Sequence, residues 1–205
     1  MSEWRGTLAL MTDLVDLGPA GRQLMTIATG VTDSQLDAPT PCAGRSVRQL
    51  LGHVVGLTAS FRDAAHKELG ARTDTSPDAD GWPEATDDWR AELAARLPEL
   101  VAAWREPAAW EGMTRAGGVD LPGEVAGVVA LDELVLHGWD LARATGQEFA
   151  CDEVSAAAVQ AFVEQFDPAG TPGLFGPAIP VAAKTSTLDR LVARSGRDPR
   201  WTPPA

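Results

Sequence analysis

The sequence has few of the residues that build metal sites and nucleophilic sites. It contains two cysteines, three histidines and no tyrosine in 205 residues. Cys42 and Cys151 lie far apart, so they form neither a CxxC pair nor a disulfide framework, and two separate thiols are the simpler interpretation. Any imidazole in a functional site must therefore come from His53, His66 or His137.

Basic residues and long apolar runs are also scarce. The 17 Lys and Arg residues against 29 Asp and Glu give a net charge of -12, which argues against a nucleic-acid or anionic-membrane partner. No apolar run approaches the roughly 18 residues of a membrane span, and Asp13 and Asp16 interrupt any signal-peptide core. With 44% hydrophobic and 22% charged residues, the composition is that of a globular protein. We expect it to be cytoplasmic.

Apolar residues at helical spacing predict four long helices. They cover about 8–31, 46–69, 87–106 and 120–145. Ser46 and Gln49 have the form of a capping box, Asp120–Pro122 resembles a helix cap, and Gly146 is typical of a helix end. Shorter helices are predicted at about 152–166 and 186–194. Residues 71–88 are predicted to form a surface loop, and 110–119 show no helical period.

These elements predict an all-α fold. Strand signals are weak, and no repeat or change in composition divides the chain. Long amphipathic helices joined by loops are typical of a helix bundle. We therefore expect one domain over 1–205, a four-helix bundle on which residues 168–205 pack as a C-terminal extension. The apolar faces of the bundle leave a homodimer open.

One face of the fourth predicted helix carries an unusual set of polar residues. At about 100° per residue, His137 lies about 40° from Glu133, and Asp140 lies about 20° from it on the other side. The rest of this face is small and apolar. Burial of charges there is costly without a compensating cation, and a metal ion would provide one.

The second predicted helix supplies one more candidate. His53 shares its face with apolar and small residues, whereas His66 falls on the opposite, solvent-facing side. The inward set of His53, Glu133 and His137 is that of an open catalytic zinc site. Alternatives remain for each part of it: a chance E-x-x-x-H, a hydrogen-bonded core histidine, and an Asp140 that caps a helix or pairs with an arginine. Cys42 is interpreted as a small buried residue.

Several motifs resemble a known family. Residues 37–42 (DAPTPC) and 47–56 (VRQLLGHVVG) resemble the start of the second helix in the mycothiol-dependent maleylpyruvate isomerase family of the DinB superfamily. Residues 133–146 (ELVLHGWDLARATG) resemble its second motif. The tail is similar to that of a stand-alone actinobacterial subgroup of metal-binding proteins. The tail motifs are 175–177 (FGP), 189–191 (DRL) and 196–201 (GRDPRW).

The resemblance implies a DinB-like four-helix bundle that holds a divalent metal. The metal is usually zinc, with Ni²⁺ or another ion as alternatives, and its ligands fall on His53, Glu133 and His137. Asp140 matches an acidic position that supports catalysis in the isomerase. That isomerase also has a separate C-terminal domain that supplies an arginine, and this chain is too short to hold such a domain. Maleylpyruvate is therefore not the expected substrate.

The expected activity is that of a thiol transferase or isomerase-like enzyme. A zinc ion with three protein ligands keeps one position for a small thiol, here mycothiol, and favours its deprotonated form. The partners are then this thiol and a small electrophile. Asp140 accepts the thiol proton, holds His137 or binds the cofactor, and Arg45, Arg48 and Arg143 are candidates for an acidic substrate. A non-catalytic metal-binding or interaction protein and a metal-dependent hydrolase are the alternatives.

Overall fold

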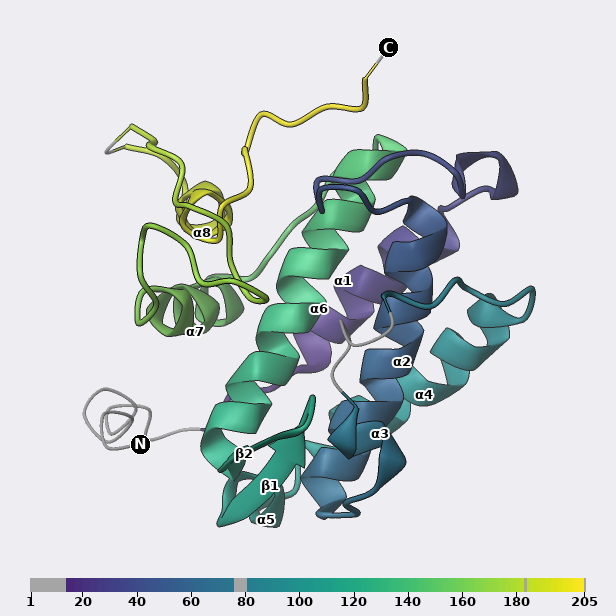
Figure 1. Ribbon diagram of the computed structural model, residues 1–205, viewed down its shortest axis with the longest axis vertical. Helices are drawn as coiled ribbons and strands as arrows, with labels where there is room; N and C mark the ends of the chain where they lie inside the picture. Colours follow the sequence, from purple (N-terminus) through teal and green to yellow (C-terminus); the bar gives the residue numbers. More distant parts are fainter. Residues whose placement is uncertain (1–13, 76–80, 183, 205) are drawn as a thin grey trace.

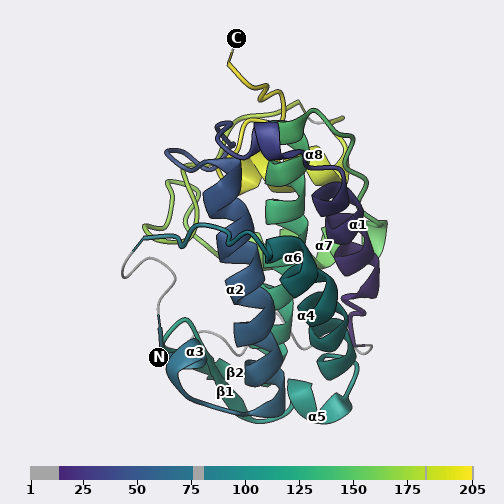
Figure 2. The same ribbon diagram turned by 90° about the vertical axis from the view of Figure 1, so that its right-hand side faces the viewer.

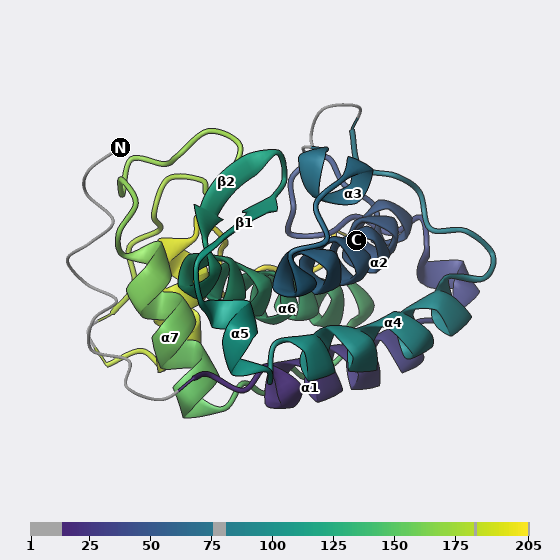
Figure 3. The ribbon, with the colours of Figure 1, turned by 90° about the horizontal axis from the view of Figure 1, so that it is seen from below.

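Four helices form a bundle in the computed structural model, which describes residues 14–75, 81–182 and 184–204. They are α1 (Gly18–Thr29), α2 (Val47–His66), α4 (Trp89–Ala103) and α6 (Gly123–Thr145). Both α2 and α1 pack against α4 and α6, and the view along the bundle shows two layers of two helices (Figure 3). The predicted all-α bundle is confirmed.

The remaining elements lie at the ends and on one side of the bundle. They are η2 (Asp33–Gln35), α3 (Ala71–Asp74), α5 (Pro107–Trp110), β1 (Met113–Ala116), β2 (Val119–Pro122), α7 (Glu153–Val163) and α8 (Thr187–Arg194). Helix α7 packs on α6 and α8 packs on α7, on the side of α6 away from α2 (Figure 1). The hairpin lies at one end of the bundle and α8 near the other (Figure 2). Helix α6 is therefore covered on several faces.

The helix boundaries follow local side-chain chemistry. Ser46 accepts a hydrogen bond from the Gln49 amide, and the Gln49 side chain accepts one from the Ser46 amide, which confirms the capping box of α2. Gly146 has φ 71° and ends α6, as predicted. Helix α1 begins at Gly18, so residues 14–17 are not helical, and predicted positions 8–13 lie outside the described residues. Pro19 belongs to its first turn, where a missing N–H costs nothing.

The segment before α6 differs from the prediction. Residues 113–122 form an antiparallel hairpin in which Arg115 pairs with Asp120 across the strands. Its two loop residues, Gly117 and Gly118, have φ 59° and 78°, which suits a tight two-residue turn. Asp120 therefore lies in β2 and pairs with Arg115 at 2.7 Å instead of capping a helix. Four-residue strands show too little alternation to be recognised from sequence.

The predicted loop at 71–88 also contains structure. Its first four residues form α3, which packs on α2 and β1. Asp63 on α2 is 3% exposed and accepts hydrogen bonds from Arg62 and from Arg72 on α3. None of the described helices has the length and apolarity needed to cross a bilayer.

Substitution of Asp63 tests how α3 is attached. Burial raises the pKa of Asp63, but the Arg62 and Arg72 guanidiniums bring it below its ordinary value. The ionised carboxylate therefore stabilises the fold at neutral pH, and this contribution is lost as the pH falls through the folded-state pKa. We expect Asp63→Asn to lower the free energy of unfolding by about 1–3 kcal/mol at pH 7 in urea titrations.

The same titrations at acidic pH check the sign. The gap between wild type and Asp63→Asn should shrink below about pH 5, where the wild-type carboxyl begins to protonate. Asp120→Asn is the matched control, since its ion pair with Arg115 is exposed and screened by solvent. A gap that is constant with pH would contradict the assignment.

Candidate metal centre

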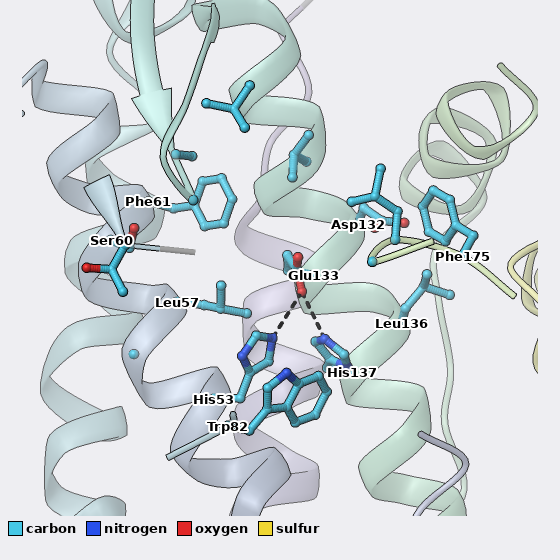
Figure 4. Close-up of a pocket in the computed structure, with 18 of the residues that line it drawn as sticks. His53, Leu57, Ser60, Phe61, Trp82, Asp132, Glu133, Leu136, His137 and Phe175 are labelled. Carbon is cyan, nitrogen blue, oxygen red and sulfur yellow. Dashed lines mark ion pairs between the residues drawn. The ribbon is translucent and has the colours of Figure 1, made fainter. Parts of the chain in front are cut away.

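Three side chains predicted as metal ligands converge between α2 and α6. His53 Nε2 lies 3.8 Å from Glu133 Oε2, and His137 Nε2 lies 2.9 Å from the same oxygen. The two imidazole rings are perpendicular, with centroids 5.0 Å apart. Both rings point toward the Glu133 carboxylate (Figure 4). Each histidine is about 5% exposed, so the bundle holds the cluster in a largely dry environment.

The spacing of these donor atoms suits a small divalent ion. Nitrogen and oxygen ligands at about 2.0–2.2 Å in tetrahedral geometry are separated by about 3.3 Å. The observed separations of 2.9 and 3.8 Å lie on either side of that value, and all three donor atoms lie within 4.8 Å of one another. Two imidazoles and one carboxylate leave one tetrahedral position for another ligand.

Asp140 connects this cluster to the C-terminal extension. It is fully buried, and its Oδ2 lies 3.0 Å from His137 Nδ1. Arg197 donates to both of its oxygens, from Nε at 2.8 Å and from Nη2 at 2.9 Å. The Asp140 carboxylate is placed to accept from Nδ1–H of His137, and a neutral His137 held in this way would present its Nε2 lone pair to the cluster, which is the tautomer a metal requires.

Cys42 belongs to the same network. Its Sγ donates to Asp140 Oδ2 at 3.0 Å and lies 3.9 Å from His137 Nδ1. The sulfur therefore lies behind His137, on the side away from Glu133. Cys42 was expected to be a small buried residue without a role in the site. It is partly buried and contacts the residues that orient His137.

Charge within the cluster is closely balanced. Burial raises the pKa of Asp140, but the Arg197 guanidinium and the His137 hydrogen bond lower it to about 2. Burial also raises the pKa of Glu133, and hydrogen bonds from His137 and His53 more than reverse this effect. Burial lowers the pKa of His137, yet Asp140, Cys42 and Glu133 raise it well above its ordinary value. Both carboxylates are thus ionised, and positive charge on Arg197 and His137 balances them; a bound metal ion would take the place of the His137 Nε2 proton.

Trp82 forms a wall over the cluster. Its ring stacks on the His53 ring, with centroids 4.0 Å apart and planes within 3°. Arg45 lies over the Trp82 ring, 5.1 Å from its centroid. The segment after Trp82 lies against α2 at Gly52, where the Ala85 amide donates to the Arg48 carbonyl. The close approach is possible because Gly52 has no side chain.

A large cavity opens beside the cluster. Its volume is about 1680 Å³, and it extends to both sides of Glu133. On the α2 side it is lined by Leu57, Ser60 and Phe61, and on the other side by Leu136, Phe175 and Asp132 (Figure 4). A small molecule therefore has access to the donor cluster from two directions.

Asp132 is the least expected residue of this cavity. It precedes Glu133 on α6, is 6% exposed, and points away from Glu133 toward Phe175 (Figure 4). Burial, with a contribution from the Glu133 charge, raises the pKa of Asp132 to about 8. The sequence contains one signal for its burial. Helix α6 is apolar around most of its circumference, so an acidic residue on it has little exposed surface available.

The remaining residues predicted from the sequence lie at different distances from the site, and only one of the three arginines lines the cavity. Arg45 lines the cavity, whereas Arg48 pairs with Asp37 at 3.6 Å, and Arg143 donates to the Pro199 carbonyl. His66 is exposed, as expected. Arg197 was not among the predicted site residues, although it lies within the 196–201 tail motif, because nothing in the local sequence shows that the tail folds back onto α6.

Comparison with known proteins assigns the chain to a family. Residues 17–142 match the mycothiol maleylpyruvate isomerase N-terminal domain family. This match covers more than half of the chain, and the chain therefore belongs to that family. Two uncharacterized proteins of Mycobacterium tuberculosis, MT0763 and Rv0738, are each 28% identical to it over 179 residues, or 85% of this chain and 91% of theirs.

Solved structures share the fold. The mycothiol-dependent maleylpyruvate isomerase aligns with a TM-score of 0.58 and 19% identity, over 73% of this chain and 67% of that chain. A mutant of that enzyme gives a TM-score of 0.58 at 18% identity, with the same coverage. The DinB-like bundle predicted from the motifs is thus confirmed.

Substitution of Gly52 tests the wall formed by Trp82. A Cβ at Gly52 would lie 2.7 Å from the Ala85 amide nitrogen and closer still to the Pro83 carbonyl oxygen. Gly52→Ala should push this segment off α2, change the tryptophan fluorescence, and lower the free energy of unfolding by about 1–3 kcal/mol. Gly56→Ala, one helical turn later, is the control: nothing lies within 4 Å of its Cβ, and alanine should stabilise α2 by up to about 1 kcal/mol. Equal effects would refute the close packing.

Proposed function

We propose that the protein is a zinc-dependent thiol transferase or isomerase-like enzyme that uses mycothiol or a similar small thiol. The observation that carries the proposal is the cluster of His53, Glu133 and His137 at the wall of a cavity of about 1680 Å³. A structural metal site is enclosed by protein, whereas a catalytic site keeps one position accessible. Membership of a family named for mycothiol and maleylpyruvate isomerase supports the choice of thiol.

In this proposal three side chains bind the metal ion, and the thiol in turn binds to the metal ion. His53 and His137 would bind the metal through Nε2 and Glu133 through Oε2. A bound zinc ion would favour the thiolate form of a small thiol at neutral pH. The thiol proton would leave to water in the cavity. As the π bond of the electrophile breaks and its electron pair moves to the neighbouring atom, which water protonates, the sulfur would form a new carbon–sulfur bond. In a transferase this bond remains; in an isomerase it breaks again and returns the thiol.

Asp140 acts in this proposal as a positioning residue. Its oxygens accept from Arg197, His137 and Cys42, and its side chain has no exposed surface. It is therefore poorly placed to take a proton from a thiol in the cavity, and well placed to fix the tautomer of His137. Arg197 compensates its charge. The C-terminal extension therefore contributes an arginine to this cluster, where it contacts Asp140.

The acidic electrophile is best accommodated near Arg45. This side chain lines the cavity and is oriented by Trp82, which itself stacks on His53. Arg62 and Arg72 also line the cavity, but Asp63 binds both. Arg45 is thus the arginine from the sequence prediction that the geometry favours for an anionic substrate.

Metal content tests the ligand set. We expect purified protein to retain one equivalent of zinc after dialysis, and His53→Ala and His137→Ala to lose it. Asp140→Asn should keep the ligands but weaken binding by about 10–100-fold, as is typical when the hydrogen-bond partner of a ligand is removed. His66→Ala is the control, because His66 is an exposed residue on the same helix as His53. A full equivalent of zinc in either ligand variant would refute the site.

Product analysis tests the reaction. Zinc-loaded protein, mycothiol and a chromogenic electrophile should give a product whose mass includes the thiol, or an isomerised product when maleylpyruvate is supplied. His53→Ala should fall to the uncatalysed rate. A product that has gained only water would identify a hydrolase, and no turnover across several electrophiles would identify a non-catalytic metal-binding protein.

A further inference from the structure

Asp132 is placed as a ligand-binding residue without a protein partner. It makes no hydrogen bond or ion pair with any of the described residues, and its Oδ1 is the one buried carboxyl oxygen among them that lacks a hydrogen-bond partner. Buried polar groups are nearly always paired, because an unpaired one loses its bonds to water without replacement. A leucine here would be less costly to bury. No described residue fills this acceptor, which leaves it open to a ligand.

The nearest cation does not serve as that partner. The Arg197 charge acts on Asp132, but its Nε and Nη2 donate to Asp140, and its Nη1 donates to Ser195 Oγ at 3.2 Å. Arg197 is thus bound by Asp140 and Ser195 and makes no hydrogen bond with Asp132. Asp132 is left facing the cavity that it lines.

The surroundings of Asp132 are apolar and come from the C-terminal part of the chain. Phe175 is 9% exposed and packs edge-on against Phe166 and Phe162, with centroids 5.0 and 6.3 Å away. The segment that carries Phe175 packs closely against Gly196. A Cβ at Gly196 would lie 2.6 Å from backbone atoms of Gly176, so this approach requires glycine. A carboxyl set in an aromatic wall selects a molecule with an apolar segment and a hydrogen-bond donor at a fixed distance along it.

We propose that Asp132 and this phenylalanine wall form a subsite for the tail of the thiol, and that Asp132 accepts a hydrogen bond from a hydroxyl or ammonium group on that tail. The proposal rests on the proposed function, because it assumes that the sulfur binds at His53, Glu133 and His137. Asp132 and Glu133 are consecutive on α6 and line the same cavity, so one molecule can reach both. Asp132 then determines which thiol is accepted.

Matched thiols test the subsite without turnover. The probes are 1-hexanethiol, 6-mercapto-1-hexanol and 6-amino-1-hexanethiol, which differ only in the terminal methyl, hydroxyl or ammonium group. Their dissociation constants are measured from the sulfur-to-metal absorption band of the cobalt-substituted protein. The quantity compared is the preference for each polar thiol over 1-hexanethiol. We expect Asp132→Leu to reduce both preferences about tenfold, the value of one hydrogen bond.

A conservative variant and a control separate recognition from folding. Asp132→Asn keeps a carbonyl acceptor, so it should retain much of the preference for the hydroxyl and lose that for the ammonium. Ser60→Ala, on the opposite side of the same cavity, should change neither. Because no described residue pairs with Asp132, Asp132→Leu should also raise the midpoint of thermal unfolding of the ligand-free protein.

Each outcome decides one of the two proposals. If no thiol changes the cobalt spectrum, the proposed function fails, and the subsite falls with it. If the thiols bind and Asp132→Leu leaves both preferences at their wild-type values, the subsite is refuted while the proposed function stands. A lower unfolding midpoint for both Asp132 variants would show that the carboxyl holds the fold, and would also overturn the assignment.

Discussion

The structure depends on how one buried carboxylate is compensated. Asp140 has no exposed surface, and a lone charge in that position would be prohibitively costly. Three groups from distant parts of the sequence satisfy it: Cys42 before α2, His137 on α6 and Arg197 in the extension. The ion pair attaches the extension to the bundle, and the same carboxylate orients a proposed metal ligand. Fold and site are therefore stabilised by the same contacts.

The cavity results from the way α6 is covered. A bundle helix usually buries one stripe, but α6 packs against α1 and α2 on one side and α7 on another. The polar residues of α6 therefore face different neighbouring elements. Glu133 and His137 face His53 across the bundle, and Asp132 faces the phenylalanine wall (Figure 4). Trp82 and Arg45 close the side near His53. A cavity with a candidate metal-binding cluster, an arginine and an acid that no described residue pairs with offers contacts to several chemical groups of one molecule.

Local patterns predicted the elements that depend on neighbouring residues. The Ser46–Gln49 capping box and Gly146 define their helix ends through bonds within a few residues. The hairpin at 113–122 was not predicted. Each of its four-residue strands is stabilised by pairing with the other strand and by packing on α2 and α6, and neither contact leaves a pattern in the local sequence. The start of α1 was placed too early, since apolar spacing does not show where a helix begins when a Gly-Pro pair can either interrupt it or start it.

The sequence by itself determined the set of candidate ligands. With three histidines in the chain and a fixed angle per residue along a helix, His53, Glu133 and His137 were the inward-facing group and His66 the outward-facing one. Only the tertiary structure decided what surrounds them. Arg197, Cys42, Trp82 and Asp132 reach the site through loops and packing between helices. The periodicity of the sequence does not predict that these four residues lie near the ligands, because their positions depend on how the chain folds back on itself.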